Sequence, residues 1–241
     1  MSQDAFFEKK PIEAPGTWAP LAELLVPIDV IGGLASWCCP KRDSLGNGQR
    51  VLLLPGFGAG PNAMTALKSV ANGLGFDARD WGLGQNNGKV PHLLPAFVDI
   101  LKAAAEESGR PVVLVGWSLG GYIAREAARD NPDLVAHIIT LGTPVWGGPK
   151  YTTISRFYRD KGVDVDQIEA DTIERYRTPL TTPVTAYYTE SDGIVSPQAC
   201  IDHWSPNVTH VKVTCTHLGM TFSRQVLRGV TVTLRQRWPA D

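Results

Sequence analysis

The sequence predicts an α/β fold, with a mostly parallel central sheet covered by helices on both faces. Short segments rich in β-branched and other apolar residues alternate with segments of helical periodicity along most of the chain. The expected strands are apolar on both faces, which is typical of strands buried in a parallel sheet. A chain of 241 residues is long enough for one large domain of this kind.

The expected elements follow one another from residue 50 to the C-terminal region. Residues 1–49 are expected to form an N-terminal arm and packing segment, irregular to about residue 20 and with a helix and turn over 21–39, and residues 50–241 a single domain. Strands are expected at 50–54, 76–82, 111–116, 136–141, 184–190 and 208–214. Helices are expected at 62–75, 92–109, 122–130 and 218–237.

Glycine and proline mark the ends of these elements. Pro55-Gly56 ends the first strand, Gly109 is placed to cap a helix, and Asn131-Pro132 ends the next one. Pro95 lies early in its helix, where the first turn tolerates proline. Only residues 147–182 break the alternation, because they are polar and rich in Tyr, Arg and Asp. They form either a small cap or a long crossover between two strands.

Composition and charge exclude several classes of protein. The hydrophobic content is 43% and the formal net charge is −1, so no basic field attracts nucleic acid. The first residues do not form a secretory signal, and the longest apolar run near the N-terminus, 28–39, is too short to span a bilayer. We therefore expect a cytoplasmic protein without stable membrane insertion.

The cysteines give no sign of a metal site or of a disulfide framework. Four are present, at Cys38, Cys39, Cys200 and Cys215, and their spacing fits no metal-binding pattern. Reduced, buried thiols are expected.

One serine lies at a corner between an expected strand and an expected helix. In "VVLVGWSLGG", Ser118 stands between Gly116 and Gly120, directly after the strand. This pattern is typical of the strained turn that exposes a nucleophilic serine at the carboxyl edge of a parallel sheet. The glycines are expected because the backbones of strand and helix crowd there. A structural turn without chemistry is the alternative.

A serine nucleophile needs a base within hydrogen-bond reach. His217 in "TCTHLGM" is favoured because it follows the last strand, at the edge where Ser118 is expected, and Gly219 allows a tight turn after it. His203, in a loop, is the competing candidate. The other histidines are expected to be structural or at the surface: His92 at a helix start, and His137 and His210 in strands.

The base in turn needs an acid to orient it, and "YYTESDGIVSP" supplies Asp192 after an expected strand. Glu190 is the main competitor. Three further carboxylates remain candidates if the acid comes from the 147–182 segment: Asp164, Asp166 and Asp171.

An acyl-transfer intermediate also needs hydrogen-bond donors for its oxyanion. The backbone N–H of Leu119, directly after the serine, is one candidate. The other is the backbone N–H of Phe57 in "LLPGFGAG", the loop after the first strand. A glycine-rich turn that only joins strand to helix is the alternative for this loop.

Taken in order, "LLPGFGAG", "GWSLGG", "SDGIVSP" and "THLGM" resemble the α/β-hydrolase superfamily over residues 50–225. Within it, "LLPGFG", "DWGLGQNNG" and "LGTPVWG" are most similar to the bacterial lipase and esterase branch that also resembles the GPI-inositol deacylases. The resemblance implies an α/β-hydrolase fold and hydrolysis of an ester bond with no metal or organic cofactor. One departure is that many relatives carry His-Gly at the oxyanion loop, where this chain has Pro55-Gly56.

The expected substrate is a small-molecule ester, cleaved through an acyl-enzyme on Ser118. An apolar pocket is expected at the active edge from Trp81, Leu83, Trp117, Trp146 and Val195, although each could equally belong to the core. A thioesterase, lactonase or acyltransferase with the same triad is an alternative, and a non-catalytic binding protein of the same fold is a further one. The sequence gives no indication of the oligomeric state.

Overall fold

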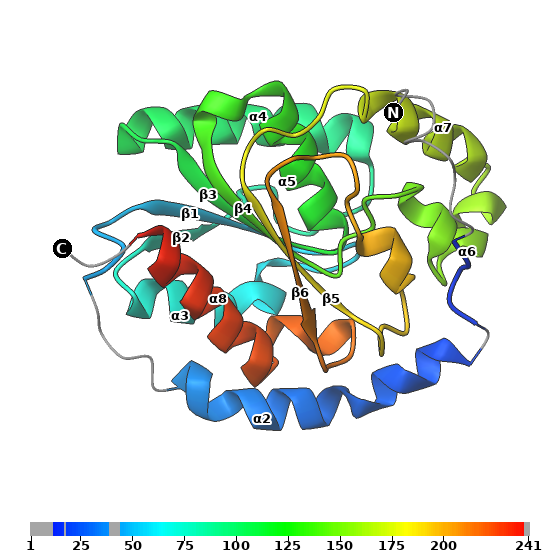
Figure 1. The fold of residues 1–241 in the computed structure, drawn as a ribbon, viewed down its shortest axis with the longest axis horizontal. Coiled ribbons are helices and arrows are strands. Elements are labelled where there is room, and N and C mark those ends of the chain that lie inside the picture. The colour runs from blue at the N-terminus through cyan, green and yellow to red at the C-terminus, as the bar shows by residue number, and fades with distance from the viewer. Residues whose placement is uncertain (1–11, 17, 39–43, 239–241) are drawn as a thin grey trace.

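Six parallel strands form one central sheet in the computed structural model, which describes residues 12–16, 18–38 and 44–238 (Figure 1). The strand order is β2-β1-β3-β4-β5-β6, and every neighbouring pair is parallel. The strands are β1 (Arg50–Leu54), β2 (Asp77–Asp80), β3 (Val112–Trp117), β4 (Val135–Leu141), β5 (Val184–Thr189) and β6 (Val208–Val213). The parallel α/β sheet expected from the sequence is confirmed, and β2 is shorter than expected.

Helices connect the strands at nearly all of the expected places. The α-helices are α2 (Val26–Cys38), α3 (Thr65–Gly73), α4 (Val90–Ser108), α5 (Leu119–Asp130), α6 (Ser155–Asp160), α7 (Val165–Arg175) and α8 (Arg224–Arg237). Short 3-10 helices are η1 (Ala19–Leu25), η2 (Pro61–Met64), η3 (Pro132–Leu134), η4 (Gly148–Tyr151), η5 (Pro197–Cys200) and η6 (Leu218–Thr221). Several helices differ from the expectation in their bounds, and the one expected at 62–75 is divided into η2 and α3. Helix α5 begins immediately after Ser118, and the last expected helix is divided into η6 and α8.

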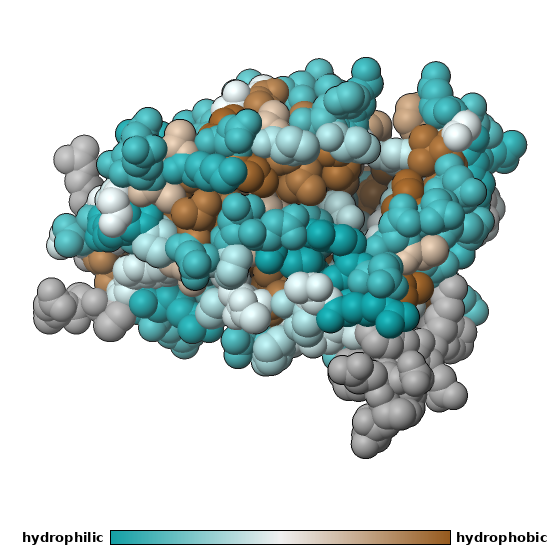
Figure 2. Space-filling view, turned by 90° about the horizontal axis from the view of Figure 1, so that it is seen from above, coloured by the Kyte–Doolittle hydropathy of each residue, from teal (hydrophilic) through white to brown (hydrophobic). Residues whose placement is uncertain are grey.

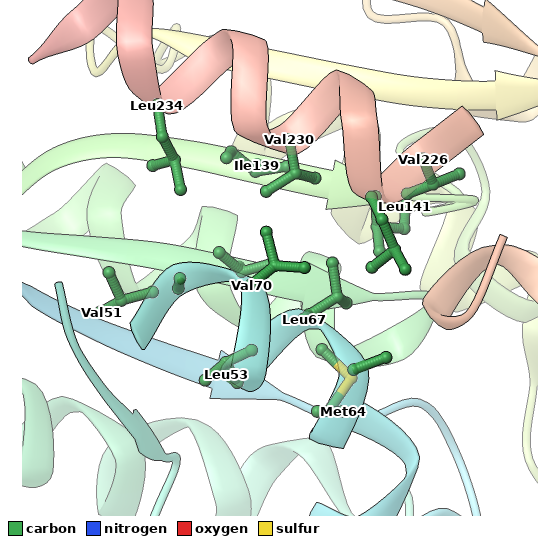
Figure 3. Packing of buried hydrophobic residues seen from close by; sticks show 14 of the residues in the cluster. Val51, Leu53, Met64, Leu67, Val70, Ile139, Leu141, Val226, Val230 and Leu234 are labelled. Carbon is green, nitrogen blue, oxygen red and sulfur yellow. The ribbon is translucent and has the colours of Figure 1, made fainter. Parts of the chain in front are cut away.

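Apolar side chains cover both faces of the sheet. On one face, α3 and α8 pack on β1, β3 and β4, as the interlocking side chains in Figure 3 show. Leu67 and Val70 of α3 and Val230 of α8 lie in this cluster. On the other face, α4 and α5 contribute Phe97, Leu101 and Ile123 to a second buried cluster. This two-sided burial explains why the strands are continuous apolar runs.

The N-terminal segment lies on the outside of the helical layer that contains α3 and α8. Helix α2 packs against α3, α8 and η6 and runs along one side of the molecule (Figure 1). Seven large apolar side chains between residues 18 and 34 are exposed: Trp18 before η1, Leu21, Leu24 and Leu25 in η1, and Ile28, Ile31 and Leu34 in α2. Residues 12–16 form no helix or strand, while the rest of the expected irregular arm up to residue 11 lies outside the described residues. The division of the chain at residue 50 stays a prediction.

The 147–182 segment contains η4, α6 and α7 and lies between β4 and β5. Ion pairs hold it to the body, because Arg175 of α7 bonds Glu126 of α5 at 2.9 Å and also pairs with Asp130. Deeper in the same region, Arg125 of α5 pairs with Asp202, both fully buried. Burial raises the pKa of Asp202, but the charge of Arg125 and backbone hydrogen bonds outweigh burial and bring the pKa to about 2.

Among the described residues, Cys200 and Cys215 are buried free thiols, as expected. Burial raises the pKa of Cys215 to about 12, so this thiol stays protonated. Cys39 and the side chain of Cys38 lie outside the described residues. No helix in the described part of the chain is long and apolar enough to cross a bilayer.

We expect the protein to lose stability in mild acid because of His137. This side chain in β4 is 0% exposed, and its Nε2 lies 3.0 Å from the Thr185 hydroxyl. Burial, helped by the charge of Arg237, lowers the pKa of His137 from 6.5 to about 4. Between these values the unfolded chain binds a proton that the folded chain does not. The contribution of neutral His137 to the free energy of unfolding is therefore fully present above pH 6.5. It falls by about 2–3 kcal/mol as the pH drops toward 4.

Urea unfolding of wild type and His137→Gln at about pH 7 and about pH 4.5 checks this expectation. The variant should lose about 2–3 kcal/mol less than wild type between the two pH values. His203→Gln, which removes an exposed histidine, is the matched control and should behave as wild type does. Equal losses in wild type and His137→Gln would contradict the assignment.

Candidate active site

The topology brings the loops of interest to one edge of the sheet. Strand order reverses between β1 and β3, because β1 leads outward to β2 whereas β3 leads the other way to β4. In open α/β sheets, ligands bind outside the carboxyl ends of the strands at such a switch point. The Phe57 loop follows β1 and Ser118 follows β3, so both lie at this point. Asp192 and His217 follow β5 and β6 at the same edge.

Ser118 occupies a strained turn between β3 and α5. Its φ is +52° and its ψ is −122°, a combination that a residue with a side chain rarely adopts. A Cβ on Gly120 would collide with the carbonyl oxygen of Leu54, and a Cβ on Gly116 with the backbone of Gly121. The expected crowding of strand and helix is therefore confirmed.

Two hydrogen bonds hold the backbone of the serine. The N–H of Ser118 donates to the carbonyl of Leu141 at 2.8 Å, and the Thr143 hydroxyl donates to the Ser118 carbonyl at 3.0 Å. The residue itself is partly exposed. The backbone N–H groups of Leu119 and Gly120 begin α5, and a helix start carries partial positive charge that favours an anion.

His217 and Asp192 form a buried pair. A hydrogen bond of 2.7 Å joins the ring Nδ1 of His217 to Oδ2 of Asp192, and the two residues are 2% and 6% exposed. The other carboxylate oxygen of Asp192 accepts hydrogen bonds from the N–H groups of Ile194 and Val195, at 2.9 and 2.6 Å. The carboxylate is therefore fixed on one oxygen and presents the other to the imidazole, which defines the ring's tautomer.

The imidazole of His217 lies beside the serine turn. The Trp117 ring lies 5.7 Å from the imidazole, and its Nε1–H donates to the His217 carbonyl at 3.1 Å. A Cβ on Gly142 would stand 2.9 Å from His217 Nδ1. Gly142 directly follows Leu141, whose carbonyl accepts the N–H of Ser118, so the ring lies near the end of the strand that holds the serine backbone.

The competing residues do not contact His217. Glu190 is exposed and pairs with Lys212 at 2.6 Å. Of the carboxylates in the 147–182 segment, Asp164 caps α7, Asp166 pairs with Lys150 and Asp171 accepts a bond from Gln167. His203 lies exposed in its loop with its ring near Trp204. These placements leave Asp192 as the carboxylate bonded to the imidazole.

Asn86, which sequence reasoning missed, holds the candidate oxyanion loop. The residue is 0% exposed. Its side-chain amide donates to the Pro55 carbonyl at 2.8 Å, and its backbone carbonyl accepts the N–H of Gly58 at 2.8 Å. Residues 55–59, including Phe57, are thereby bound to the "GQNNG" loop. A Cβ on Gly56 would stand 3.3 Å from Cβ of Ser118, so this loop passes close to the serine. The asparagine-rich loop was the available signal, but asparagine in a loop has many roles.

The expected pocket residues occupy different environments. Trp81 is 0% exposed and packs against Phe97 within the second core cluster. Trp117 is buried in the first cluster against the His217 ring, whereas Trp146 and Val195 lie in a third cluster, where Trp146 stacks on Trp204 at 4.4 Å. Of these five residues only Leu83 is partly exposed. The indole of Trp81 donates to the Gly84 carbonyl, so its polar atom is used within its own loop.

Aromatic side chains from α6 lie over the candidate oxyanion loop. The Phe57 ring lies 6.1 Å from Phe157 and 5.8 Å from Tyr158. Figure 2 shows a hollow with apolar walls between the main body, on the left, and the lobe that carries α6 and α7, on the right. Phe157 is 49% exposed, so the 147–182 segment contributes apolar surface near this loop. In the described ranges, no group of three or more His, Cys, Asp or Glu could hold a metal ion.

Known structures share the fold at low identity. A monoacylglycerol lipase from Paleococcus ferrophilus has a TM-score of 0.58 and 18% identity, with 82% of this chain and 96% of that chain covered. Bacillus licheniformis lipase BlEst2 has a TM-score of 0.62 and 15% identity, with 78% of this chain and 91% of that chain covered. At these identities the likeness establishes the fold alone.

A curated relative and a family model give closer sequence matches. A pimeloyl-[acyl-carrier protein] methyl ester esterase from Aromatoleum aromaticum is 33% identical over 93 residues, which are 39% of this chain and 36% of that protein. The match thus spans about a third of the relative. The model of the alpha/beta hydrolase family matches residues 51–235, most of the chain and all six strands but the first residue of β1. The chain belongs to the alpha/beta hydrolase family.

Proposed function

We propose that the protein is a serine carboxylesterase of the lipase and esterase type, which cleaves small-molecule esters through an acyl-enzyme on Ser118. The observation that carries this proposal is the buried hydrogen bond between His217 and Asp192, beside a serine in a strained strand-to-helix turn. A hydroxyl becomes nucleophilic at neutral pH when a base takes its proton and an acid orients that base. These three side chains have the chemistry for those roles.

The reaction would proceed in two steps, acylation of Ser118 and hydrolysis of the acyl-enzyme. Ser118 Oγ attacks the acyl carbon and its proton passes to Nε2 of His217, while Asp192 stabilises the resulting imidazolium. The N–H groups of Leu119 and Phe57 hold the oxyanion. The His217 proton then passes to the leaving alcohol as the ester C–O bond breaks. Water then attacks the acyl-enzyme and gives a proton to His217, which passes it to Ser118 Oγ as the acid leaves and the serine is regenerated.

The choice of an ester substrate is supported by the relatives. The curated relative is a methyl ester esterase, and the two structural neighbours described above are lipases. The exposed Phe157 and the partly exposed Leu83 add apolar surface that suits the acyl part of an ester. A panel of p-nitrophenyl esters of increasing chain length, with matched thioesters and lactones, tests the substrate class. Product analysis with added alcohols tests acyl transfer.

Ser118→Ala should abolish ester hydrolysis while leaving the fold intact. We expect kcat to fall by about 10⁴-fold or more, because the nucleophile is lost while binding of the ester remains. A fluorophosphonate should label wild type at Ser118, located by mass spectrometry, and should leave the variant unlabelled. Ser108→Ala is the matched control, since Ser108 ends α4 just before β3 begins, whereas Ser118 follows the other end of β3. Substantial turnover or labelling in Ser118→Ala would contradict the proposal.

Asn86→Ala should slow the reaction by loosening the candidate oxyanion loop. Removing the amide leaves the Pro55 carbonyl without its donor, and an error of about 1 Å in a catalytic group can cost about 10²-fold in rate. We expect kcat and the rate of fluorophosphonate labelling each to fall about 10- to 100-fold. Asn87→Ala is the matched control, because Asn87 is exposed and its side chain bonds only the N–H of Lys89. Equal rates in the two variants would contradict the role of Asn86.

A further inference from the structure

One carboxylate from the N-terminal segment joins the loops that carry Asp192 and His217. Oε1 of Glu23 accepts the N–H of Gly193 at 2.9 Å and the N–H of His217 at 3.0 Å. Oε2 of Glu23 accepts the N–H of Leu218 at 2.9 Å. A single side chain of η1 is thus bonded to the residue after the candidate acid and to the backbone of the candidate base.

A second carboxylate supports the same loop one residue earlier. Oδ2 of Asp29 in α2 accepts both the N–H and the hydroxyl of Thr216, at 2.9 and 2.8 Å. The Thr216 hydroxyl in turn accepts the N–H of Gly219 at 2.9 Å. The segment 216–219 is therefore bound on both sides of His217 by acidic side chains of the N-terminal segment.

Glycines allow these carboxylates to come close. A Cβ on Gly193 would stand 2.5 Å from the carbonyl oxygen of Ala19 and 2.8 Å from Oε1 of Glu23. A Cβ on Gly219 would collide with the Asp29 carboxylate. The sequence suggests that Gly219 allows a tight turn. The structure shows a steric requirement for glycine at this position. The loops and the N-terminal segment therefore fit together without room for a side chain at either position.

We propose that Glu23 is a positioning residue that fixes the acid loop and the base loop relative to each other. The inference rests on the proposed function, because its effect on catalysis acts through His217 and Asp192. An ionised carboxylate only accepts hydrogen bonds, so it can hold several backbone N–H groups at once, and bonds to a charged acceptor are stronger than neutral ones. Such support sets the distance and angle of the 2.7 Å bond between His217 and Asp192.

The first test compares steady-state kinetics of wild type, Glu23→Ala and Glu23→Gln on a short p-nitrophenyl ester. We expect kcat of Glu23→Ala to fall about 10- to 100-fold while KM stays within about 2-fold, because the reacting groups are misplaced and the ester pocket is not. Glu23→Gln should fall less, since its amide oxygen still accepts from Gly193 and His217 while its NH₂ cannot accept from Leu218. Glu13→Gln is the matched control, because Glu13 is an exposed carboxylate of the same segment.

The second test does not depend on turnover. The Nδ1 proton of His217, shared with Asp192, should give a downfield ¹H NMR signal in wild type, assigned by its absence from His217→Gln. The signal should persist in Glu13→Gln, weaken in Glu23→Gln and vanish in Glu23→Ala. Unchanged kcat and an unchanged signal in Glu23→Ala would overturn the proposal. If Glu23→Ala does not fold, a wild-type kcat and signal in Glu23→Gln overturn it.

The two proposals fail in different ways. A wild-type protein that neither hydrolyses esters nor takes up the fluorophosphonate at Ser118 would refute the proposed function. The NMR signal would still decide whether Glu23 holds the His217–Asp192 bond. The converse outcome is that the wild-type protein hydrolyses esters and takes up the label while both Glu23 variants keep the wild-type kcat and NMR signal. That outcome would support the esterase proposal and refute the positioning role of Glu23.

Discussion

The close approach of α5 to the ends of β1 and β3 is the constraint on which the candidate site depends. Glycine at 116 and 120 lets the helix start against the Leu54 carbonyl, and no larger residue fits there. This contact forces Ser118 into its positive φ, directs the first N–H groups of α5 toward the sheet edge, and keeps the Phe57 loop beside the serine. Because the contact is made by backbone atoms, it is rigid, and rigid supports hold reacting groups more precisely than mobile loops do.

The other half of the site is held in a different way, by acidic side chains that accept hydrogen bonds from loop backbones. Asp192 accepts from Ile194 and Val195, and Glu23 accepts from Gly193 and His217. Irregular loops have N–H groups that no strand or helix satisfies, and carboxylates are well suited to bond them. The same carboxylates thus give the two loops their shape and hold them beside each other.

Local patterns could predict the strands, the helices and the candidate residues Ser118, Asp192 and His217, which the structure brings to one edge of the sheet, since each depends on its immediate neighbours in the sequence. Contacts between distant segments could not be predicted. Asn86 bonds a residue 31 positions away, and Glu23 bonds residues 170 to 195 positions away, while both look like ordinary surface residues in sequence. Arg125 and Glu126 are likewise buried by distant segments, because Arg125 pairs with Asp202 and Glu126 with Arg175 of α7. The direction of a side chain at a strand end could not be predicted either, so the sequence left pocket and core equally open for Trp81, which lies in the second core cluster.

The long sequence separation of the Glu23 contacts also determines the order in which the molecule can be assembled. Residue 23 leaves the ribosome early, whereas the loops at 193 and 217 are made in the last fifth of the chain. Contacts between such distant segments close large loops and form late in folding. During synthesis, η1 and α2 are therefore made long before η6 and α8, although α3 follows soon after them. Their large apolar side chains are exposed in this interval. The nascent chain is therefore most prone to aggregation just before the contacts of Glu23 with the Asp192 and His217 loops form.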